Sequence, residues 1–530
     1  MKNLLLLLTL FLASQLVWAI DIPYVIKQAN SVMQIQTELQ KIINDATATD
    51  RVVVTGSKTD ADITLTLLIG VGKTVVWQAV YQSVPTLAPS TLLEFSGSGT
   101  FELADGALIC ENTHALHATG TGSAIIVSGT GKIQTSGAMV QGEDVHAIKT
   151  SGYVEIKDNA QIIGTGGEVI ASFSNNAMVM VSGGTITTNS GNAIITFGKD
   201  AKILISGGYV SNNAKGLYPA VIALDESPGN NKSLVHVSGT AIVEAKGDGN
   251  AIISNGGVIL SGNAYVSNTN GGANNTAAVW STNPMEVRDN AKISASKGYA
   301  VMCHSIIVRD SSIIEAKENA IAIFMSPGSG KGIFEMRDKA QVIAANNHAM
   351  IHNNSGITFN FFGGTMFAYG KDISDVIKDL PSPVISETGL VLAWDKEAGN
   401  TIYQKGSSVD IFKTPENAVA YWDKKGNQHG IYYENSSNTG FIPIETVTVE
   451  EVGIGEITNY KLRIYPNPTT GELTIDNGQL TIKNVEIYDI FGRKVLVPPL
   501  TILRSYDLTV LPPSIYLLRV DNEWAKVVKQ

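Results

Sequence analysis

Four basic residues each precede an aspartate at a recurring corner of the sequence, and such pairs could act on a polysaccharide or bind a metal ion. The pairs are Lys157-Asp158, Arg288-Asp289, Arg309-Asp310 and Arg337-Asp338. The last three would stack a basic row beside an acidic row if they lie on successive turns of a repeat. Catalysis on a glycosidic bond needs two carboxylates at a defined separation in a cleft, and nothing isolates such a pair from the row. We favour the simpler interpretation, in which Asp replaces Gly at a turn and the basic neighbour offsets its charge.

Two further patterns resemble sites for phosphate or metal but lack essential members. Gly72-Lys73-Thr74 matches the end of a phosphate-binding loop, which needs a glycine five residues before Gly72, where Leu67 stands. His348 and His352 are four residues apart and could share one face of a strand. Two ligands are too few for a metal site, so the sequence predicts neither a metal nor another cofactor.

The composition of the chain indicates a turn-rich β protein. Charged residues make up 16% of the 530 residues, against about 25% in an average protein. The 51 glycines are also more than usual. A hydrophobic content of 44% excludes wholesale disorder, and a net charge of −10 without a basic patch excludes nucleic acid as a partner.

One unit recurs from about residue 92 onward, and its strands and turns would position the side chains of any site. It has a short β-prone run, a Ser-Gly or basic-Asp corner and a second short run, and a third run begins with Ala between corners. The corner markers are Gly97, Gly129, Asp158, Gly183, Gly207, Gly239, Gly262, Asp289, Asp310, Asp338 and Gly363, at intervals of 21 to 32 residues. Three short strands per period and no helical periodicity predict a parallel β-solenoid, in which each coil buries its inward residues against its neighbours.

The predicted fold class is all-β, and the region from about 50 to 380 resembles the right-handed parallel β-helix proteins. This resemblance is architectural and carries no catalytic residues. The segment Gln34–Asn44 places Ile35, Leu39, Ile42 and Ile43 on one helical face, which predicts a helical cap at the start of the coil.

The two cysteines, Cys110 and Cys303, are separated by about seven coils of the predicted solenoid. At a rise of about 4.8 Å per coil, they would lie roughly 30 Å apart, whereas a disulfide needs Cα atoms within about 7 Å. We therefore expect both cysteines to be unpaired and buried.

The first residues read as a signal peptide. Lys2 is followed by an apolar run from Leu4 to Leu12 and then by Val17, Trp18 and Ala19, with cleavage expected after Ala19. The apolar run is shorter than the roughly 20 residues that span a membrane, although an uncleaved anchor is the alternative. We expect no later membrane-spanning segment.

The last seventy-five residues, 456–530, carry three specific blocks. They are YPNPTTGELTI, VEIYDIFGRKV and LPPSIYLLRV, the last followed by a basic end. In this order they closely resemble the type A C-terminal sorting domain of the type IX secretion system of Bacteroidota, although Ser514 stands where that family usually has Gly. About seven short strands are expected here, in a small immunoglobulin-like sandwich. The residues that carry the resemblance are Tyr465, Pro466, Asn467, Pro468, Gly471, Asp489, Gly492, Arg493 and Tyr516.

The resemblance implies export across both membranes, recognition by the secretion machinery, removal of the tail and, commonly, attachment of the passenger to surface lipopolysaccharide. The predicted divisions are a signal peptide at 1–19, a cap and first coils at 20–91, the β-helix at 92–380, a β-rich module and linker at 381–455, and the sorting domain at 456–530. Aromatic side chains between 381 and 445 could stack on sugar rings or form the core of the module.

For the passenger we expect a non-catalytic role in adhesion, glycan contact or surface structure. The alternative is a polysaccharide lyase or glycoside hydrolase built on the same coil.

Overall fold

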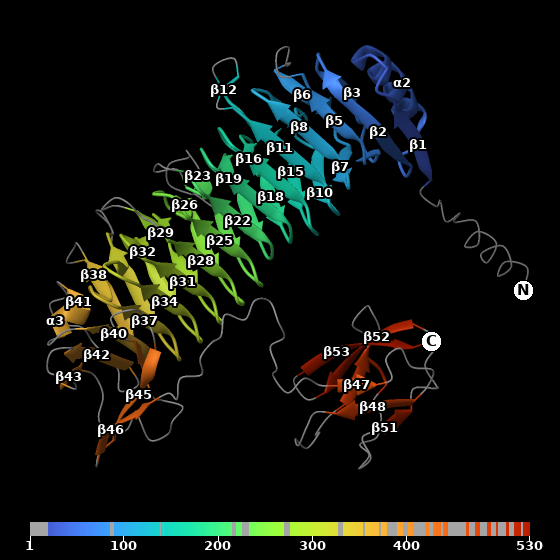
Figure 1. Ribbon diagram of the computed structural model, residues 1–530. Coiled ribbons are helices and arrows are strands. Elements are labelled where there is room, and N and C mark those ends of the chain that lie inside the picture. Colours follow the sequence, from blue (N-terminus) through green and yellow to red (C-terminus); the bar gives the residue numbers. More distant parts are fainter. Residues whose placement is uncertain are drawn as a thin grey trace, which may run out of the picture. The chain divides into compact units, whose positions relative to one another are not determined.

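The computed structural model (Figure 1) describes residues 20–378, except for 85–89, 138, 141–142, 215–218, 225–232, 270–275, 327–331, 353–355 and 370–372, and beyond 378 it describes strands alone. The chain divides into one unit that ends at Glu445 and a second that begins at Thr446. No helix among the described residues is both long and apolar enough to span a membrane.

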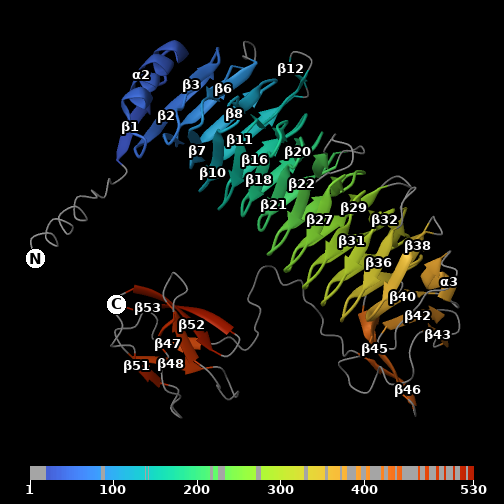
Figure 2. The same cartoon turned by 180° about the vertical axis from the view of Figure 1, so that it is seen from behind.

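The first unit is the predicted parallel solenoid, and each full coil contributes one strand to each of three sheets (Figures 1 and 2). Sheet A contains β1 (Asp21–Ile26), the first half of β2 (Arg51–Ala61), β4 (Thr74–Trp77), β7 (Thr100–Ala104), β10 (Ala124–Ser128), β15 (Tyr153–Ile156), β18 (Met178–Val181), β21 (Lys202–Ile205), β24 (Leu234–Val237), β27 (Gly257–Leu260), β30 (Met285–Val287), β33 (Ile306–Val308), β36 (Ile333–Met336) and β39 (Thr358–Phe361).

Sheet B follows sheet A within each coil. It contains the second half of β2, β5 (Val80–Ser83), β8 (Ala107–Glu111), β11 (Lys132–Ser136), β16 (Gln161–Gly164), β19 (Thr185–Thr188), β22 (Tyr209–Asn212), β25 (Ile242–Ala245), β28 (Tyr265–Asn268), β31 (Lys292–Ala295), β34 (Ile313–Ala316), β37 (Gln341–Ala344), β40 (Gly364–Tyr369) and β42 (Gly389–Asp395). β43 (Thr401–Lys405) pairs with β42 in the antiparallel direction.

Sheet C closes each coil. Its strands are β3 (Leu65–Leu68), β6 (Thr91–Ser96), β9 (His114–Ala118), β14 (Ile148–Thr150), β17 (Ile170–Ser172), β20 (Ile194–Phe197), β23 (Val221–Leu224), β26 (Ile252–Ser254), β29 (Ala277–Ser281), β32 (Tyr299–Cys303), β35 (Ile321–Met325), β38 (Met350–His352) and β41 (Ile377–Lys378). A short hairpin of β12 (Met139–Val140) and β13 (Glu143–Asp144) precedes β14, and α3 (Ile373–Val376) precedes β41.

The core is a stack of aliphatic side chains held in register from coil to coil. Val154 of β15 pairs with Ile125 before it and Val179 after it, and all three are fully buried. Alternate residues of each strand point inward because successive side chains of a strand lie on opposite faces. The three-strand periodicity of the sequence and its inward aliphatic runs are therefore confirmed. The right-handed winding stays a prediction.

The predicted helical cap is confirmed as α2 (Val32–Asp45), which begins two residues earlier and ends one residue later than expected. Val32, Ile35, Leu39 and Ile43 are buried beneath it, and Ile42 packs at the margin of the core. Ser31 caps the N-terminus in a reciprocal capping box with Gln34.

The amide side chains of α2 cover the free edge of sheet C. Gln40 accepts the main-chain N–H of Leu68 at 2.7 Å and donates to its carbonyl at 3.0 Å, while Gln36 accepts the N–H of Thr66 at 3.0 Å. β1, which the sequence did not predict, forms the edge of sheet A and carries Pro23, whose nitrogen has no hydrogen to donate. Both features oppose edge-to-edge strand addition.

The corner markers hold in most coils, with two corrections. Gly97 follows a strand of sheet C, so it lies at a different corner from the other markers, and Asp105 (φ 62°) occupies the corner between sheets A and B in that coil. At Ser-Gly-Gly corners the positive φ falls on the second glycine, as at Gly184 and Gly208, and not on the markers Gly183 and Gly207. The second difference arises because these corners contain two consecutive glycines, either of which can adopt a positive φ.

Beyond the solenoid, β44 (Val419–Trp422), β45 (Gln428–Asn435) and β46 (Asn438–Pro443) form an antiparallel sheet. The second unit has two antiparallel sheets. One contains β47 (Arg463–Tyr465), β48 (Glu472–Asp476) and β51 (Ser505–Asp507), and the other contains β49 (Val485–Tyr488), β50 (Lys494–Leu496), β52 (Ser514–Val520) and β53 (Glu523–Lys529). The described strands of this unit number seven, as expected for the tail. Their immunoglobulin-like arrangement stays a prediction.

Candidate functional site

The carboxylates of the Asp corners bind the backbone of neighbouring coils. Asp289, Asp310 and Asp338 have φ angles of 59°, 61° and 61°, in the left-handed region that L-residues other than Asn and Asp rarely adopt. Asp289 accepts the N–H of Gly262 at 2.8 Å. Asp310 accepts the N–H of Asp289 at 3.0 Å, and Asp338 accepts the N–H of Asp310 at 3.2 Å. These three aspartates, which we call the Asp row, therefore join successive coils by hydrogen bonds.

The arginines beside these corners pair with acidic residues on the outer face of sheet A. The pairs are Arg288–Glu286 at 4.0 Å, Arg309–Glu286 at 2.7 Å, Arg309–Asp310 at 2.9 Å, and Arg337–Glu335. The hydrogen bond to Glu286 raises the pKa of the Arg309 guanidinium. The six groove candidates do line up on successive coils. The three arginines pair with Glu286, Asp310 or Glu335, and the three aspartates accept main-chain N–H groups.

A second row lies at the entry to sheet C and was missed by the sequence analysis. Four residues from successive coils line up there: His114, His146, Glu168 and Asn192. His146 Nδ1 lies 3.2 Å from His114 Nδ1, its Nε2 lies 3.0 Å from Glu168 Oε2, and Asn192 donates to Glu168 Oε1 at 3.4 Å. We call these four residues the His row.

The backbone restricts the tautomer of the His row. The main-chain N–H of His146 donates to His114 Nδ1 at 3.1 Å, so this nitrogen is an acceptor and the His114 proton sits on Nε2. The ring of His146 faces this same His114 nitrogen through Nδ1 and faces Glu168 through Nε2. A His–carboxylate pair of this kind can serve a general base. Here the His146 residue is only 3% exposed, so the ring is inaccessible to a substrate and the pair fastens coils together.

One signal in the sequence could have revealed the His row. His114 and His146 each precede an alanine that starts the third run of a coil, as Asn192 precedes Ala193. Alignment of the coils on these alanines places the polar residues in one column.

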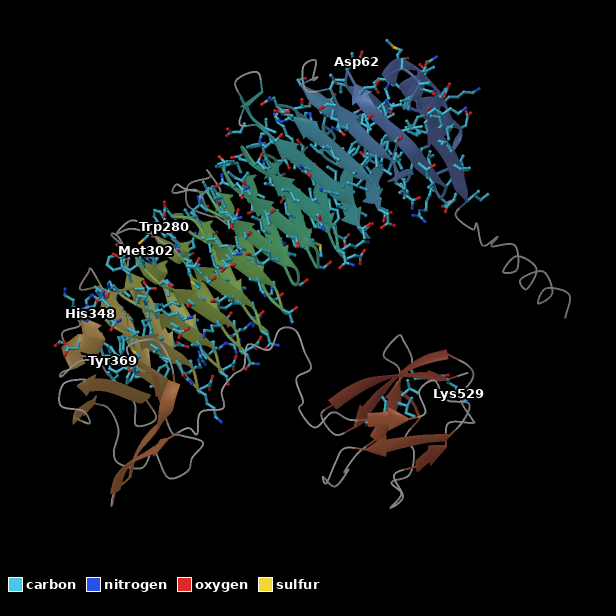
Figure 3. All side chains as sticks on the ribbon, viewed as in Figure 1. Asp62, Trp280, Met302, His348, Tyr369 and Lys529 are labelled. Carbon is cyan, nitrogen blue, oxygen red and sulfur yellow. The ribbon has the colours of Figure 1, made fainter. Side chains whose placement is uncertain are left out.

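The outer face of sheet C carries an apolar row over its second half. Its members stand at equivalent positions of successive strands and comprise Ile222, Ile253, Trp280, Met302, Phe324 and Ile351. Trp280 and Met302 project next to each other from neighbouring strands (Figure 3). Trp280 is 37% exposed, and its neighbours Val279 and Ser281 point inward and are buried. The Tyr299 ring lies 4.8 Å from that of Phe324 between centroids. We call this set the Trp280 row.

Towards the N-terminus the same column becomes polar. Glu94, His117 and Lys149 occupy its positions on β6, β9 and β14, and His117 Nδ1 lies 3.2 Å from Glu94. Burial lowers the pKa of His117, against the opposing effect of Glu94. This column of sheet C therefore carries charged side chains on β6, β9 and β14 and apolar side chains on the later strands.

The remaining candidates have structural roles. Lys73 donates to the carbonyls of Ile43 and Asn44 at 2.7 and 2.9 Å, so the lysine of the apparent phosphate loop caps the C-terminus of α2. His348 Nδ1 lies 3.0 Å from the Asp375 carbonyl, whereas His352 is buried on the inner face of β38. In the part of the chain that the structure describes, no group of three or more His, Cys, Asp or Glu could hold a metal ion.

The second unit is set apart by its own antiparallel sheets, and its blocks occur in the order expected for a sorting signal. Residues 463–530 match the family described as the secretion system C-terminal sorting domain. The tail is a type IX sorting domain. No curated protein and no solved structure matches the chain. The sorting domain implies interaction with the secretion machinery and export to the cell surface or the medium.

Two motif residues of the sorting domain can be placed. Tyr465 ends β47, and the buried Tyr516 lies on β52 between its partners β49 and β53. The others lie outside the described residues and are Pro466, Asn467, Pro468, Gly471, Asp489, Gly492 and Arg493. Their roles in sorting stay predictions.

Proposed function

We propose that the solenoid is a non-catalytic binding protein of the cell surface that contacts glycans through the Trp280 row. A cleaved signal peptide starts its export, and the sorting domain is removed when the passenger is attached to surface lipopolysaccharide. The observation that carries the proposal is an exposed indole on the outer face of sheet C among apolar neighbours.

The chemistry of this face suits the apolar side of a neutral sugar ring. The C–H face of a pyranose packs on an aromatic ring, while its hydroxyl groups stay at the rim in water. Tyr299 adds a phenol next to Phe324. Successive coils repeat about every 4.8 Å, so an extended glycan chain could meet equivalent positions along the sheet.

The roles of the acidic and basic groups support the non-catalytic choice over a lyase or hydrolase. The corner carboxylates accept backbone N–H groups, and Arg309 is paired with Glu286 and Asp310. The His146–Glu168 pair is buried. Each of these groups stabilises the coil in its present geometry.

The test is a glycan-array screen of the chain that starts at Ile20, with Trp280→Ala and Ile242→Ala compared on every hit. Ile242 is also 37% exposed but lies on sheet B, so it controls for the loss of an exposed apolar side chain. We expect at least tenfold weaker binding for Trp280→Ala and unchanged binding for Ile242→Ala. Equal effects of the two variants, or no glycan bound, would contradict the proposed surface. Release of reducing ends or unsaturated sugars from a bound glycan would favour the enzyme instead.

A further inference from the structure

Ile20, the residue that follows the predicted cleavage point, is held at both ends of its backbone. Its carbonyl accepts the N–H of Arg51 at 2.9 Å, and its own N–H donates to Asp50 Oδ1 at 3.4 Å. These contacts place the start of β1 directly over the start of β2 in sheet A. The first coil is therefore fastened at Ile20.

The carboxylate of Asp50 is held in place to accept a hydrogen bond from Ile20. Its residue is only 7% exposed, and its Oδ2 accepts both the N–H and the hydroxyl of Thr47, at 2.8 and 2.7 Å. These hydrogen bonds lower the pKa of the Asp50 carboxyl, led by the hydroxyl of Thr47. Thr47 occupies one oxygen, and the other oxygen faces the nitrogen of Ile20.

The nitrogen of Ile20 changes its chemistry if the chain is cut there. Ala19 directly precedes it and Val17 lies two residues before Ala19, so the positions that a signal peptidase reads hold a small and an aliphatic residue. Hydrolysis adds water across the Ala19–Ile20 bond, so the carbonyl of Ala19 becomes a carboxylate and the Ile20 nitrogen becomes an amine. With a pKa of about 8, that amine is mostly an ammonium at pH 7.

We propose that removal of the signal peptide after Ala19 creates an ion pair between the Ile20 ammonium and Asp50, which locks β1 onto the first coil. The inference rests on the signal peptide in the proposed function, but it is independent of glycan binding. A partly buried, charge-assisted hydrogen bond is stronger than the neutral amide contact that it replaces. The mature protein would thus be more firmly closed at this end than its precursor.

The neighbouring charges are compatible with this pair. Arg51 is drawn away toward Asp21 and Glu102, at 3.7 Å from each. Arg51 therefore leaves the Asp50 carboxylate to the backbone N–H groups of Ile20 and Thr47 and to the Thr47 hydroxyl.

The first experiment reads the mature N-terminus by mass spectrometry on protein recovered from the cell surface or the medium. We expect the chain to begin at Ile20. A different first residue would overturn the proposal and would leave the glycan-binding test unaffected.

The second experiment measures amide hydrogen exchange in β1 for two otherwise identical full chains, one beginning at Ile20 and one retaining Ala19. We expect at least fivefold slower exchange in Asp21–Ile26 for the chain that begins at Ile20, with β39 unchanged. Asp50→Asn can keep the hydrogen bonds with Thr47 through its amide oxygen, but it removes the charge and turns an NH2 donor toward Ile20, so it should abolish the difference between the two chains. Asp45→Asn, at the exposed end of α2, should preserve it. Equal exchange in the two chains, or a difference that survives Asp50→Asn, would overturn the ion pair.

Discussion

Asp310 accepts the main-chain N–H of Asp289 at 3.0 Å, so the carboxylate of one corner satisfies the backbone of the corner in the preceding coil. The same relationship continues from Asp310 to Asp338 at 3.2 Å. Asp at these corners therefore does two jobs, because it tolerates the positive φ and it joins adjacent coils.

The two jobs of Asp310 can be separated by substitution. Asp310→Asn keeps an acceptor and should cost little stability. Asp310→Gly keeps the φ freedom but loses the acceptor, so it should cost about 1 kcal/mol. Asp310→Ala loses the acceptor and also strains the backbone, which adds about 1 kcal/mol. Urea unfolding of the three variants measures their free energies of unfolding and so their order of stability. Equal stability of the Ala and Gly variants would show that φ strain is absent.

The arginines beside the Asp corners should be dispensable for binding. We expect the double substitution Arg309→Ser and Asp310→Gly to lower stability modestly, because it removes the pairs with Glu286 and Asp289. Affinity for any glycan identified in the array should stay within twofold of the original. A tenfold loss of affinity with unaltered melting would instead place the ligand on this row.

Lys73 should act as a helix cap and not as a phosphate ligand. Lys73→Met keeps the apolar stem but removes the donors to Ile43 and Asn44, and should cost about 1 kcal/mol. Lys41→Met, on the exposed face of α2, is the matched control. Hydrogen exchange in the last turn of α2 should rise for Lys73→Met alone. Nucleotide binding that is lost in Lys73→Met would contradict the capping role.

Cys110 and Cys303 should be inert in the folded protein. Both are free and buried, as predicted, and Cys110 Sγ contacts the carbonyl of Thr113 at 3.1 Å. Burial raises the pKa of Cys110 to about 12 and raises that of Cys303 as well. Thiolate is the reactive form, so a thiol reagent at pH 8 should label neither residue until urea unfolds the coil. Rapid labelling of the native protein would show that the coils open locally.

His236 should make the solenoid less stable in acid. Burial, followed by the charge of Arg288, lowers its pKa, against smaller opposing effects of Asp289 and Glu286, and its Nε2 lies 2.9 Å from the Ser261 hydroxyl. At this histidine the unfolded chain therefore binds a proton more readily than the folded chain. The contribution of neutral His236 to folding stability is complete above about pH 6.5 and declines as the pH falls below that value. His236→Gln should flatten the loss of stability between pH 7 and pH 5. Parallel pH profiles for the variant and the original protein would refute this.

The sorting domain should act as a targeting signal for secretion. Truncation after Gly455 removes a unit with its own sheets and should leave a folded passenger that accumulates in the periplasm. The full chain should reach the surface and lose its tail. Cell fractionation with antibodies against passenger and tail distinguishes these outcomes, and surface display of the truncated chain would contradict the sorting role.

Local patterns were enough to predict the architecture of the solenoid. Inward aliphatic residues such as Ile125, Val154 and Val179 recur with the strand period, and Gly or Asp occupies most of the turn positions where φ is positive. The tail was recognised for the same reason, because its blocks are continuous in sequence. Each of these signals depends on residues close together in the chain.

Only the tertiary structure decided which residues of different coils meet. His146 reaches His114 across 32 residues and Glu168 across 22, while Ile20 reaches Asp50 across 30. Loops of unequal length separate these partners, so the interval in sequence does not reveal the register. The parallel hydrogen bonds between coils fix that register. They place the members of the His row and of the Trp280 row side by side, and they place Ile20 next to Asp50.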